Sequence, residues 1–243
     1  MVAGSILPIT IHNNKLFFLF GKENPLEDSA KGWSDFGGGV EKGENPYKTA
    51  LREGGEELTG FLGDGKQIQE LIKQNGGVHK LVHKKYHVHM FFLEYDENLP
   101  KYYNQNHRFL WERMDKNELS KTKLFEKIEI SWFSVDDMKN RMGEFRGFYQ
   151  DIVKEFLKDI ENITLFADKS MLSIYKRIVQ TALSKPLVQP ENNQYNPRVM
   201  QPEQQNEIAS IMLMSVVSEP TASKTNKSAN RTLKKKSREH NKT

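Results

Sequence analysis

Cysteine is absent from the sequence, and so are long apolar runs. The first absence excludes disulfide-stabilised folds, cysteine nucleophiles and zinc sites built on thiolates. The second excludes membrane-spanning helices, which need about 20 consecutive apolar residues. The first five residues also lack the basic segment and following apolar segment that mark a secretory signal peptide. We therefore expect an intracellular protein, located in the cytoplasm and without a membrane partner.

Apolar residues make up only 37% of the 243 residues, which indicates that part of the chain lies outside a packed core. Proline, asparagine and glutamine become frequent after residue 184 and remain so to residue 206. Such a composition is typical of linkers and disordered segments. We expect a folded domain with additional C-terminal helices at residues 1–183, followed by a linker and a basic, disordered tail at residues 184–243.

The positive charge is concentrated at the C-terminal end. Residues 224–243 contain eight basic residues and one acidic residue, a charge of +7, whereas the whole chain carries +4. The remaining residues therefore carry −3, which does not describe a basic nucleic-acid-binding body. The basic end has three open interpretations: contact with the phosphate backbone of RNA, a nuclear localisation cluster at residues 234–238, or a solvated terminus.

Hydrophobic periodicity predicts alternating strands and helices, and hence an α/β fold. The expected strands are residues 5–12, 15–20, 33–36, 80–95 and 128–133. The expected helices are residues 45–58, 65–74, 102–114, 148–160 and 164–183. Asn13 and Asn14 are typical of the turn of a hairpin between the first two strands. Asn45 and Pro46 are typical of a helix N-terminus.

Three carboxylates share one face of the helix predicted at residues 45–58. Glu53, Glu56 and Glu57 stand at positions i, i+3 and i+4, so they lie one turn apart and repel one another. Arg52 can pair with Glu56 but cannot neutralise all three charges. A divalent cation can, and Mg²⁺ is commonly shared between carboxylates and a substrate phosphate.

Glycines surround this acidic face. Gly54 and Gly55 interrupt the helix, each at a cost of about 0.5–1 kcal/mol relative to alanine. We expect them to admit the close approach of another segment or of a ligand. The glycines at residues 37–39 precede the helix, and their exposed carbonyl groups would complete a site for a hard cation.

The order of these residues resembles the Nudix box. Gly38, Glu44, the pair Arg52–Glu53 and the pair Glu56–Glu57 stand at the spacing Gly-x5-Glu-x7-Arg-Glu-x2-Glu-Glu of that family, and the box extends over residues 38–61. The sequence departs from the pattern twice: Gly54 replaces a bulky aliphatic residue, and Thr59 is inserted before the closing Gly60. The likeness covers about residues 5–160.

Membership of the Nudix hydrolases would imply a mixed β-sheet sandwiched between α-helices, with a loop-helix-loop metal site. It implies divalent-metal-dependent hydrolysis of a pyrophosphate bond in a nucleoside diphosphate linked to another moiety. The implied ligands of Mg²⁺ or Mn²⁺ are the carboxylates of Glu53, Glu56 and Glu57 and the carbonyl of Gly38. Arg52 would orient these carboxylates, and Glu44 would hold the loop through Arg52.

Several points stay open at this stage. The general base is Glu53 or a carboxylate on a later loop, for which Glu126 and Glu129 are the candidates. The substrate is a small nucleotide or nucleotide derivative, or, as an alternative, the 5′ end of an RNA, as in mRNA decapping. Diphosphoinositol phosphates are a further, less favoured option, because the sequence of the body shows no evident basic pocket. A non-catalytic Nudix-like binding module is the third interpretation. The sequence does not determine the oligomeric state.

Overall fold

The computed structural model describes residues 1–24, 31–119 and 126–184. The expected linker at 184–206, the basic tail and its cluster at 234–238 lie outside the described residues, apart from Ser184. An RNA contact or a localisation signal in that tail therefore stays a prediction from sequence.

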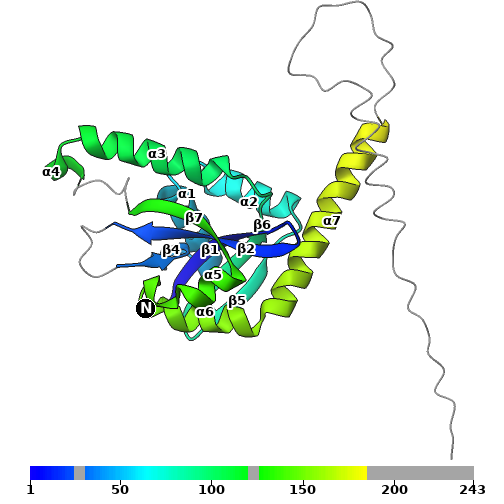
Figure 1. Cartoon of the computed structure of the whole chain (residues 1–243), viewed down its shortest axis with the longest axis horizontal. Coiled ribbons are helices and arrows are strands. Elements are labelled where there is room, and N and C mark those ends of the chain that lie inside the picture. Colours follow the sequence, from blue (N-terminus) through cyan, green and yellow to red (C-terminus); the bar gives the residue numbers. More distant parts are fainter. Residues whose placement is uncertain (25–30, 120–125, 185–243) are drawn as a thin grey trace, which may run out of the picture. The chain divides into compact units, whose positions relative to one another are not determined.

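A mixed β-sheet forms the centre of the described chain (Figure 1). Its strands are β1 (Ala3–His12), β2 (Lys15–Glu23), β3 (Trp33–Ser34), β4 (Phe36–Gly39), β5 (His79–His83), β6 (Tyr86–Phe92) and β7 (Lys127–Ser134). The main path runs β3-β2-β1-β6-β5, with β4 paired to β1 and β7 paired to β2. The pair β1–β6 is parallel and the other pairs are antiparallel.

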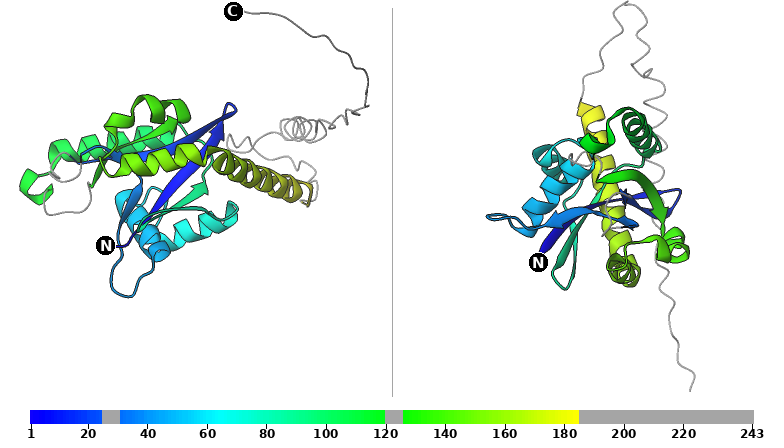
Figure 2. Two further views of the ribbon diagram at one scale, coloured as in Figure 1. Left: turned by 90° about the horizontal axis from the view of Figure 1, so that it is seen from below. Right: turned by 90° about the vertical axis from the view of Figure 1, so that its left-hand side faces the viewer.

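Helices cover both faces of this sheet, as Figures 1 and 2 show. One layer contains α1 (Pro46–Glu57), α2 (Gly65–Gln74) and α3 (Asn98–Arg113), followed by the short α4 (Lys116–Leu119). The other contains α5 (Val135–Asn140), the 3-10 turn η2 (Met142–Glu144), α6 (Tyr149–Lys158) and α7 (Ile160–Ser184). Each layer encloses its own apolar cluster against the sheet. The predicted α/β sandwich is confirmed.

The β1–β2 hairpin confirms the expected turn, because Asn13 and Asn14 both have left-handed φ values of 49° and 58°. The single strand predicted at residues 80–95 is wrong. A turn at residues 84–85 divides it into β5 and β6, and the left-handed φ of Lys84, 56°, reverses the chain. The helix predicted at residues 164–183 begins four residues earlier, at Ile160.

The start of α1 follows the prediction from sequence. The Asn45 side chain accepts a hydrogen bond of 2.9 Å from the backbone N–H of Lys48, and Pro46 occupies the first helical position. Gly54 then lets β1 approach the helix: a Cβ atom at Gly54 would lie 2.2 Å from Cδ1 of Ile6. The buried Ile6 side chain therefore fills the place that a bulky residue of α1 would take.

The C-terminal end of α1 is strained at Thr59, whose φ of 48° lies in the left-handed region. Its hydroxyl oxygen is buried and has no hydrogen-bond partner in the structure. We expect Thr59→Gly to stabilise the protein by about 1 kcal/mol, because glycine avoids the left-handed penalty. Urea unfolding measures this change. Gly60→Ala is the matched control and should destabilise, since Gly60 has a φ of 75°; a loss of stability in Thr59→Gly would contradict the assignment of strain.

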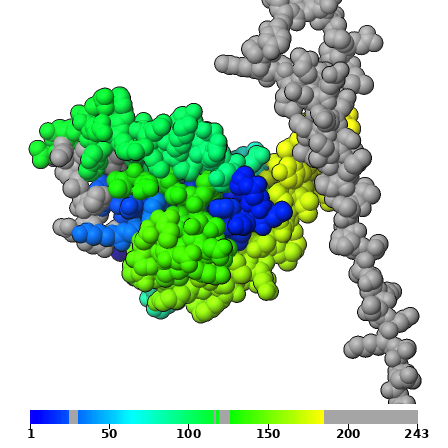
Figure 3. Space-filling model, in the orientation of Figure 1, coloured from blue at the N-terminus to red at the C-terminus, as the bar shows by residue number. Residues whose placement is uncertain are grey.

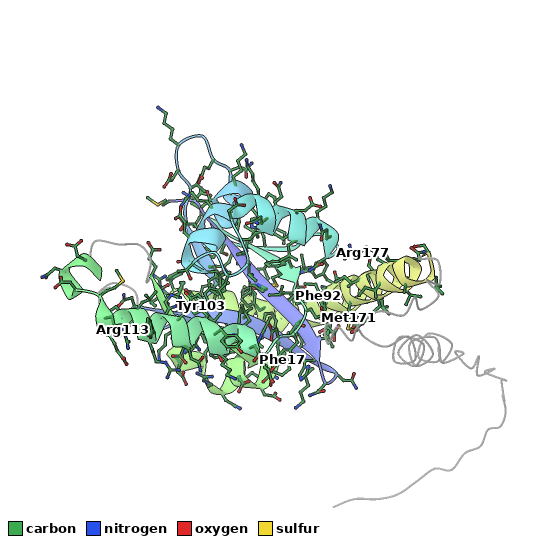
Figure 4. All side chains as sticks on the ribbon, turned by 90° about the horizontal axis from the view of Figure 1, so that it is seen from above. Phe17, Phe92, Tyr103, Arg113, Met171 and Arg177 are labelled. Carbon is green, nitrogen blue, oxygen red and sulfur yellow. The ribbon has the colours of Figure 1, made fainter. Side chains whose placement is uncertain are left out.

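Helix α3 braces the sheet beside α1. The Tyr103 hydroxyl lies 2.7 Å from the carbonyl oxygen of Glu57 and 3.0 Å from that of Lys127, and Figure 4 shows Tyr103 at the middle of the helix. The Asn104 amide exchanges two hydrogen bonds with the backbone of Ile130, at 2.8 and 3.0 Å. In the space-filling view α3 forms one edge of the visible face (Figure 3). Among the described residues, no helix is long and apolar enough to cross a membrane.

Candidate active site

Strand β4 brings the glycine-rich segment against α1. A Cβ atom at Gly38 would lie 2.3 Å from Oε1 of Glu53, so only glycine allows this contact without displacing the carboxylate. Glu53, the helix residue in this contact, is 9% exposed. Two of the residues that the sequence assigned to a cation, Gly38 and Glu53, therefore lie in direct proximity.

Arg52 joins the carboxylates of the predicted site. Its Nε lies 3.0 Å from Oε1 of Glu44, and its Nη1 lies 2.9 Å from Oε1 of Glu53 and 3.3 Å from Oε2 of Glu56. The hydrogen bonds from Arg52, and then from the Thr49 hydroxyl at 2.7 Å, hold the pKa of Glu44 at about 2. The structure thus places Arg52 where it can orient Glu53 and Glu56, with Glu44 fixing the guanidinium.

Glu57 stands one turn after Glu53 on the same face of α1 and is 5% exposed. Its Oε2 accepts a hydrogen bond of 2.8 Å from the backbone N–H of Gly37, and its Oε1 lies 3.5 Å from Nζ of Lys127. Burial raises the pKa of Glu57 well above its usual value, the charge of Lys127 opposes this effect, and the carboxylates of Glu23, Glu53 and Glu126 add to it. A bound divalent cation would relieve this excess of negative charge.

A buried ion-pair cluster beside Glu57 is the main feature that the sequence did not reveal. The ammonium of Lys127 contacts Oε1 of Glu23 and lies 2.9 Å from the Ser34 hydroxyl. Arg146, which precedes α6, donates a hydrogen bond from Nη1 to the same Glu23 oxygen, at 2.7 Å. Glu23 and Lys127 are partners across β2 and β7. In the sequence, the only sign of this cluster is a charged residue at one end of each of two apolar strands. The pairing of those strands, which brings the two charges together, is a long-range property that the sequence pattern does not give.

The two carboxylates considered as general bases on a later loop, Glu126 and Glu129, have different surroundings. Glu126 precedes β7 and lies near enough to Glu57 to raise its pKa. Glu129 pairs with Lys22, with 3.5 Å between Oε2 and Nζ, and lies near Arg141, whose pKa is raised mainly by Glu144 and to a smaller extent by Glu129. Glu126 is therefore on the side of the candidate site, and Glu129 is not.

The donor set fits a hard divalent cation. Glu53, Glu56, Glu57 and the Gly38 carbonyl supply only oxygen atoms, which is the preference of Mg²⁺ and Mn²⁺. Within residues 1–24, 31–119 and 126–184, no three acidic or histidine side chains are already gathered as a complete cation cage. Arg52 bridges Glu53 and Glu56. To bind a divalent cation, these two carboxylates would have to exchange part of their contact with the guanidinium for contact with the ion.

A second buried network lies under the glycine-rich strand. Asp35 is 1% exposed and accepts hydrogen bonds from the hydroxyls of Ser5 and Tyr86, the latter at 2.6 Å. Burial raises the pKa of Asp35 to about 6, although both hydrogen bonds oppose this rise. Ser5 pairs with Gly37 across β1 and β4, so the network supports the strand that carries Gly38.

Asp35 should make stability depend on pH. Because the folded-state pKa is above the unfolded-state value, the folded protein binds the proton more tightly and loses stability as pH rises from about 4 to about 6. The shift of about two units corresponds to roughly 3 kcal/mol. Asp35→Asn should remove this loss, about half of which falls between pH 5 and pH 7.5, where it is measured as the difference in the free energy of unfolding. Exposed Asp136→Asn is the control and should keep the wild-type slope; an unchanged slope in Asp35→Asn would refute the assignment.

The histidines of β5 and β6 do not form a metal site among the described residues. His79 binds Asp159, with 2.7 Å between Nε2 and Oδ2, and lies against α7. His89 is 3% exposed, contacts the Tyr47 ring and lies 3.1 Å from the Ser5 carbonyl. Burial lowers the pKa of His89.

The chain is similar to known proteins in sequence and in structure. A model of the NUDIX domain family matches residues 5–156. A search of curated proteins finds no match. Similar solved structures include a mutT/nudix family protein from Listeria innocua, with 15% identity over 67% of this chain and 95% of that chain, and a TM-score of 0.38. The C. elegans Ap4A hydrolase is 13% identical over 68% of this chain and 99% of that chain, with a TM-score of 0.38. Because the family model matches more than half of the chain, the chain belongs to the Nudix hydrolase family, a family of pyrophosphohydrolases.

Proposed function

We propose that this protein hydrolyses a phosphoanhydride in a nucleoside diphosphate linked to another moiety, using Mg²⁺ or Mn²⁺. The observation that carries this proposal is the close approach of Gly38 to Glu53. Arg52, which pairs with Glu53, and the buried Glu57 lie beside this contact. Glu53, Glu56, Glu57 and the Gly38 carbonyl would hold the cation. When bound, the cation neutralises phosphate charge and lowers the pKa of a bound water.

The protein's own residues position this chemistry. Arg52 fixes the direction of Glu53 and Glu56, and Glu44 fixes Arg52 through two hydrogen bonds at 3.0 and 3.2 Å. The Gly37 N–H group fixes Glu57. We assign the removal of a proton from the attacking water to Glu126 or Glu53. Glu126 is preferred to Glu129, because the charge of Glu126 acts on Glu57 and raises its pKa after burial and the charges of Glu23 and Glu53, whereas Glu129 pairs with Lys22 on β2.

The proposal also includes a domain boundary between residues 183 and 184. Residues 1–183 contain every residue assigned to the reaction, so we propose that they form the catalytic unit and that residues 184–243 serve another purpose. A panel of nucleoside triphosphates, dinucleoside polyphosphates, nucleotide sugars and capped RNA, assayed with Mg²⁺ and with Mn²⁺, tests the assignment. Release of phosphate or nucleotide that depends on the cation is expected. No turnover on the whole panel would favour a non-catalytic binding module.

An RNA 5′ end remains the alternative substrate because of the charge of +7 in residues 224–243. Contact with single-stranded RNA releases counterions, so affinity should fall by roughly 0.7 log unit per log unit of salt for each phosphate contacted. Removing residues 219–243 should then weaken RNA binding and flatten its salt dependence, without changing hydrolysis of a small nucleotide. Equal RNA binding by the truncated and full-length proteins at low salt would exclude this role of the tail.

A further inference from the structure

Lys127, the first residue of β7, is a buried charged side chain that no step proposed above uses. A buried ammonium group loses its hydration, and only close partners of opposite charge offset that loss. The identity of these partners therefore indicates what the charge does. One of them is the carboxylate of Glu57, which the proposed function assigns to the cation.

Three oxygen atoms surround the three N–H donors of the Lys127 ammonium group. Oε1 of Glu23 forms the closest contact, and the Ser34 hydroxyl lies 2.9 Å away. The third oxygen is Oε1 of Glu57, at 3.5 Å. This distance is longer than that of a normal N–H···O hydrogen bond, so the contact with Glu57 is an ion pair and the weakest of the three. Lys127 is thus bound firmly to Glu23 and loosely to Glu57.

Further contacts keep Lys127 beside Glu57. The Tyr103 hydroxyl lies 2.7 Å from the carbonyl oxygen of Glu57 and 3.0 Å from that of Lys127, so it joins the end of α1 to the start of β7. On the other side, Glu23 is the strand partner of Lys127, and Arg146 also binds Oε1 of Glu23. The backbones that carry the ammonium and the carboxylate are therefore both held in place.

The charges around Glu57 are paired within the protein. The cluster contains the carboxylates of Glu23 and Glu57. It also contains the cationic groups of Lys127 and Arg146. Both Glu57 oxygens have a protein partner, since Oε2 accepts the hydrogen bond from the Gly37 N–H. A cation that binds Glu57 therefore meets the positive charge of Lys127 at short range, in a buried place where solvent screens the repulsion weakly.

We infer that Lys127 is an internal counter-ion of the metal site: it pairs with Glu57 when no metal is bound, and it lowers the affinity of the protein for a divalent cation. Lys127 acts through Glu57, so it is a positioning residue. The inference rests on the proposed function, because that proposal makes Glu57 a ligand. With a lowered affinity, occupancy of the site depends on the phosphate oxygens that a substrate adds to the ligands of the cation.

A purely structural role for Lys127 predicts a change of the opposite sign. If Lys127 only held Glu57 in position, its loss would leave the carboxylate poorly oriented and weaken cation binding. If Lys127 competes with the cation, its loss leaves a buried carboxylate without its counter-charge, and the cation binds more tightly. The direction of the change in affinity therefore distinguishes the two roles.

Calorimetric titration of the full chain with Mn²⁺, in the absence of nucleotide, tests the inference. Lys127→Met should lower the Kd for Mn²⁺ by about tenfold or more, because the repulsion is lost. Glu23→Gln should raise the Kd by about threefold or more, because Lys127 then turns from Glu23 to Glu57. Lys22→Met is the matched control, since Lys22 lies on the same pair of strands and forms a surface pair with Glu129. It should change the Kd by less than about twofold.

Stability gives a second readout that does not depend on activity. Mn²⁺ should raise the urea stability of Lys127→Met more than that of the wild type, because stabilisation by a ligand grows as its Kd falls. In the double variant Lys127→Met/Glu57→Gln this additional stabilisation should disappear, since Lys127 acts through Glu57. If Lys127→Met does not fold even with Mn²⁺, the Kd of Glu23→Gln decides alone.

The inference is overturned if Lys127→Met binds Mn²⁺ no more tightly than the wild type, if Glu23→Gln binds it no less tightly, or if Lys22→Met changes the Kd as much. The proposed function survives these results where the wild type still hydrolyses a nucleotide with Mn²⁺. Tighter binding by Lys127→Met, together with no hydrolysis of any nucleotide by the wild type, would reject the proposed reaction and keep the inference. Absence of Mn²⁺ binding in every protein would reject both.

Discussion

Replacing Glu57 with glutamine should abolish metal-dependent hydrolysis while the protein stays folded. Glutamine keeps an oxygen that can accept the hydrogen bond from Gly37, so the contact between β4 and α1 is retained. It removes the negative charge that the cation needs. Loss of groups that only orient a metal ligand costs about 10–100-fold, so loss of the ligand itself should lower kcat by more than about 100-fold.

Three measurements separate this result from a folding defect. The variant should show cooperative urea unfolding and wild-type circular dichroism, and its affinity for Mn²⁺ in calorimetry should be reduced. Glu70→Gln, an exposed change on α2, is the matched control and should keep full activity. Wild-type turnover by the Glu57 variant would remove this residue from the metal site and weaken the proposed reaction as a whole.

Local patterns were sufficient for most elements, and they supplied the residues of the proposed site. Spacing along α1 placed three carboxylates on one face, and Asn45 with Pro46 defined where the helix begins. The patterns did not predict that Glu57 is buried and points toward Gly37 and Lys127. That direction depends on β4, which is brought to α1 by pairing with β1 rather than by any feature of the helix itself.

The positions that were not predicted have two physical causes. The partners Lys127 and Glu23 are 104 residues apart in the sequence, and only the pairing of β2 with β7 brings them together. The divided strand at residues 80–95 was missed for a different reason: its turn uses two lysines instead of glycine or asparagine, so turn composition gave no signal. In both cases tertiary structure overrides local preference.

Replacing Lys127 with methionine should be the most destabilising of the substitutions considered. Lys127 is 1% exposed and stands between Glu23 and Glu57. Burial alone would lower the pKa of Lys127, but the charges of Glu57 and Glu23 outweigh burial and raise it, so the lysine is charged at neutral pH. Removing one partner of a buried ion pair costs about 3–5 kcal/mol, because the other charge stays buried.

We expect a loss near 3 kcal/mol, since Arg146 continues to neutralise Glu23 and Glu57 is then the carboxylate left uncompensated. The loss should be smaller at low pH, where protonation of Glu57 removes its charge, and smaller in the double variant Lys127→Met/Glu57→Gln. Lys22→Met is the matched control, because Lys22 is half-exposed and forms a surface pair with Glu129 worth less than about 1 kcal/mol. Urea unfolding at pH 5 and pH 8 measures all four proteins. Equal stability of the Lys127 and Lys22 variants would show that the buried cluster contributes no more than a surface pair.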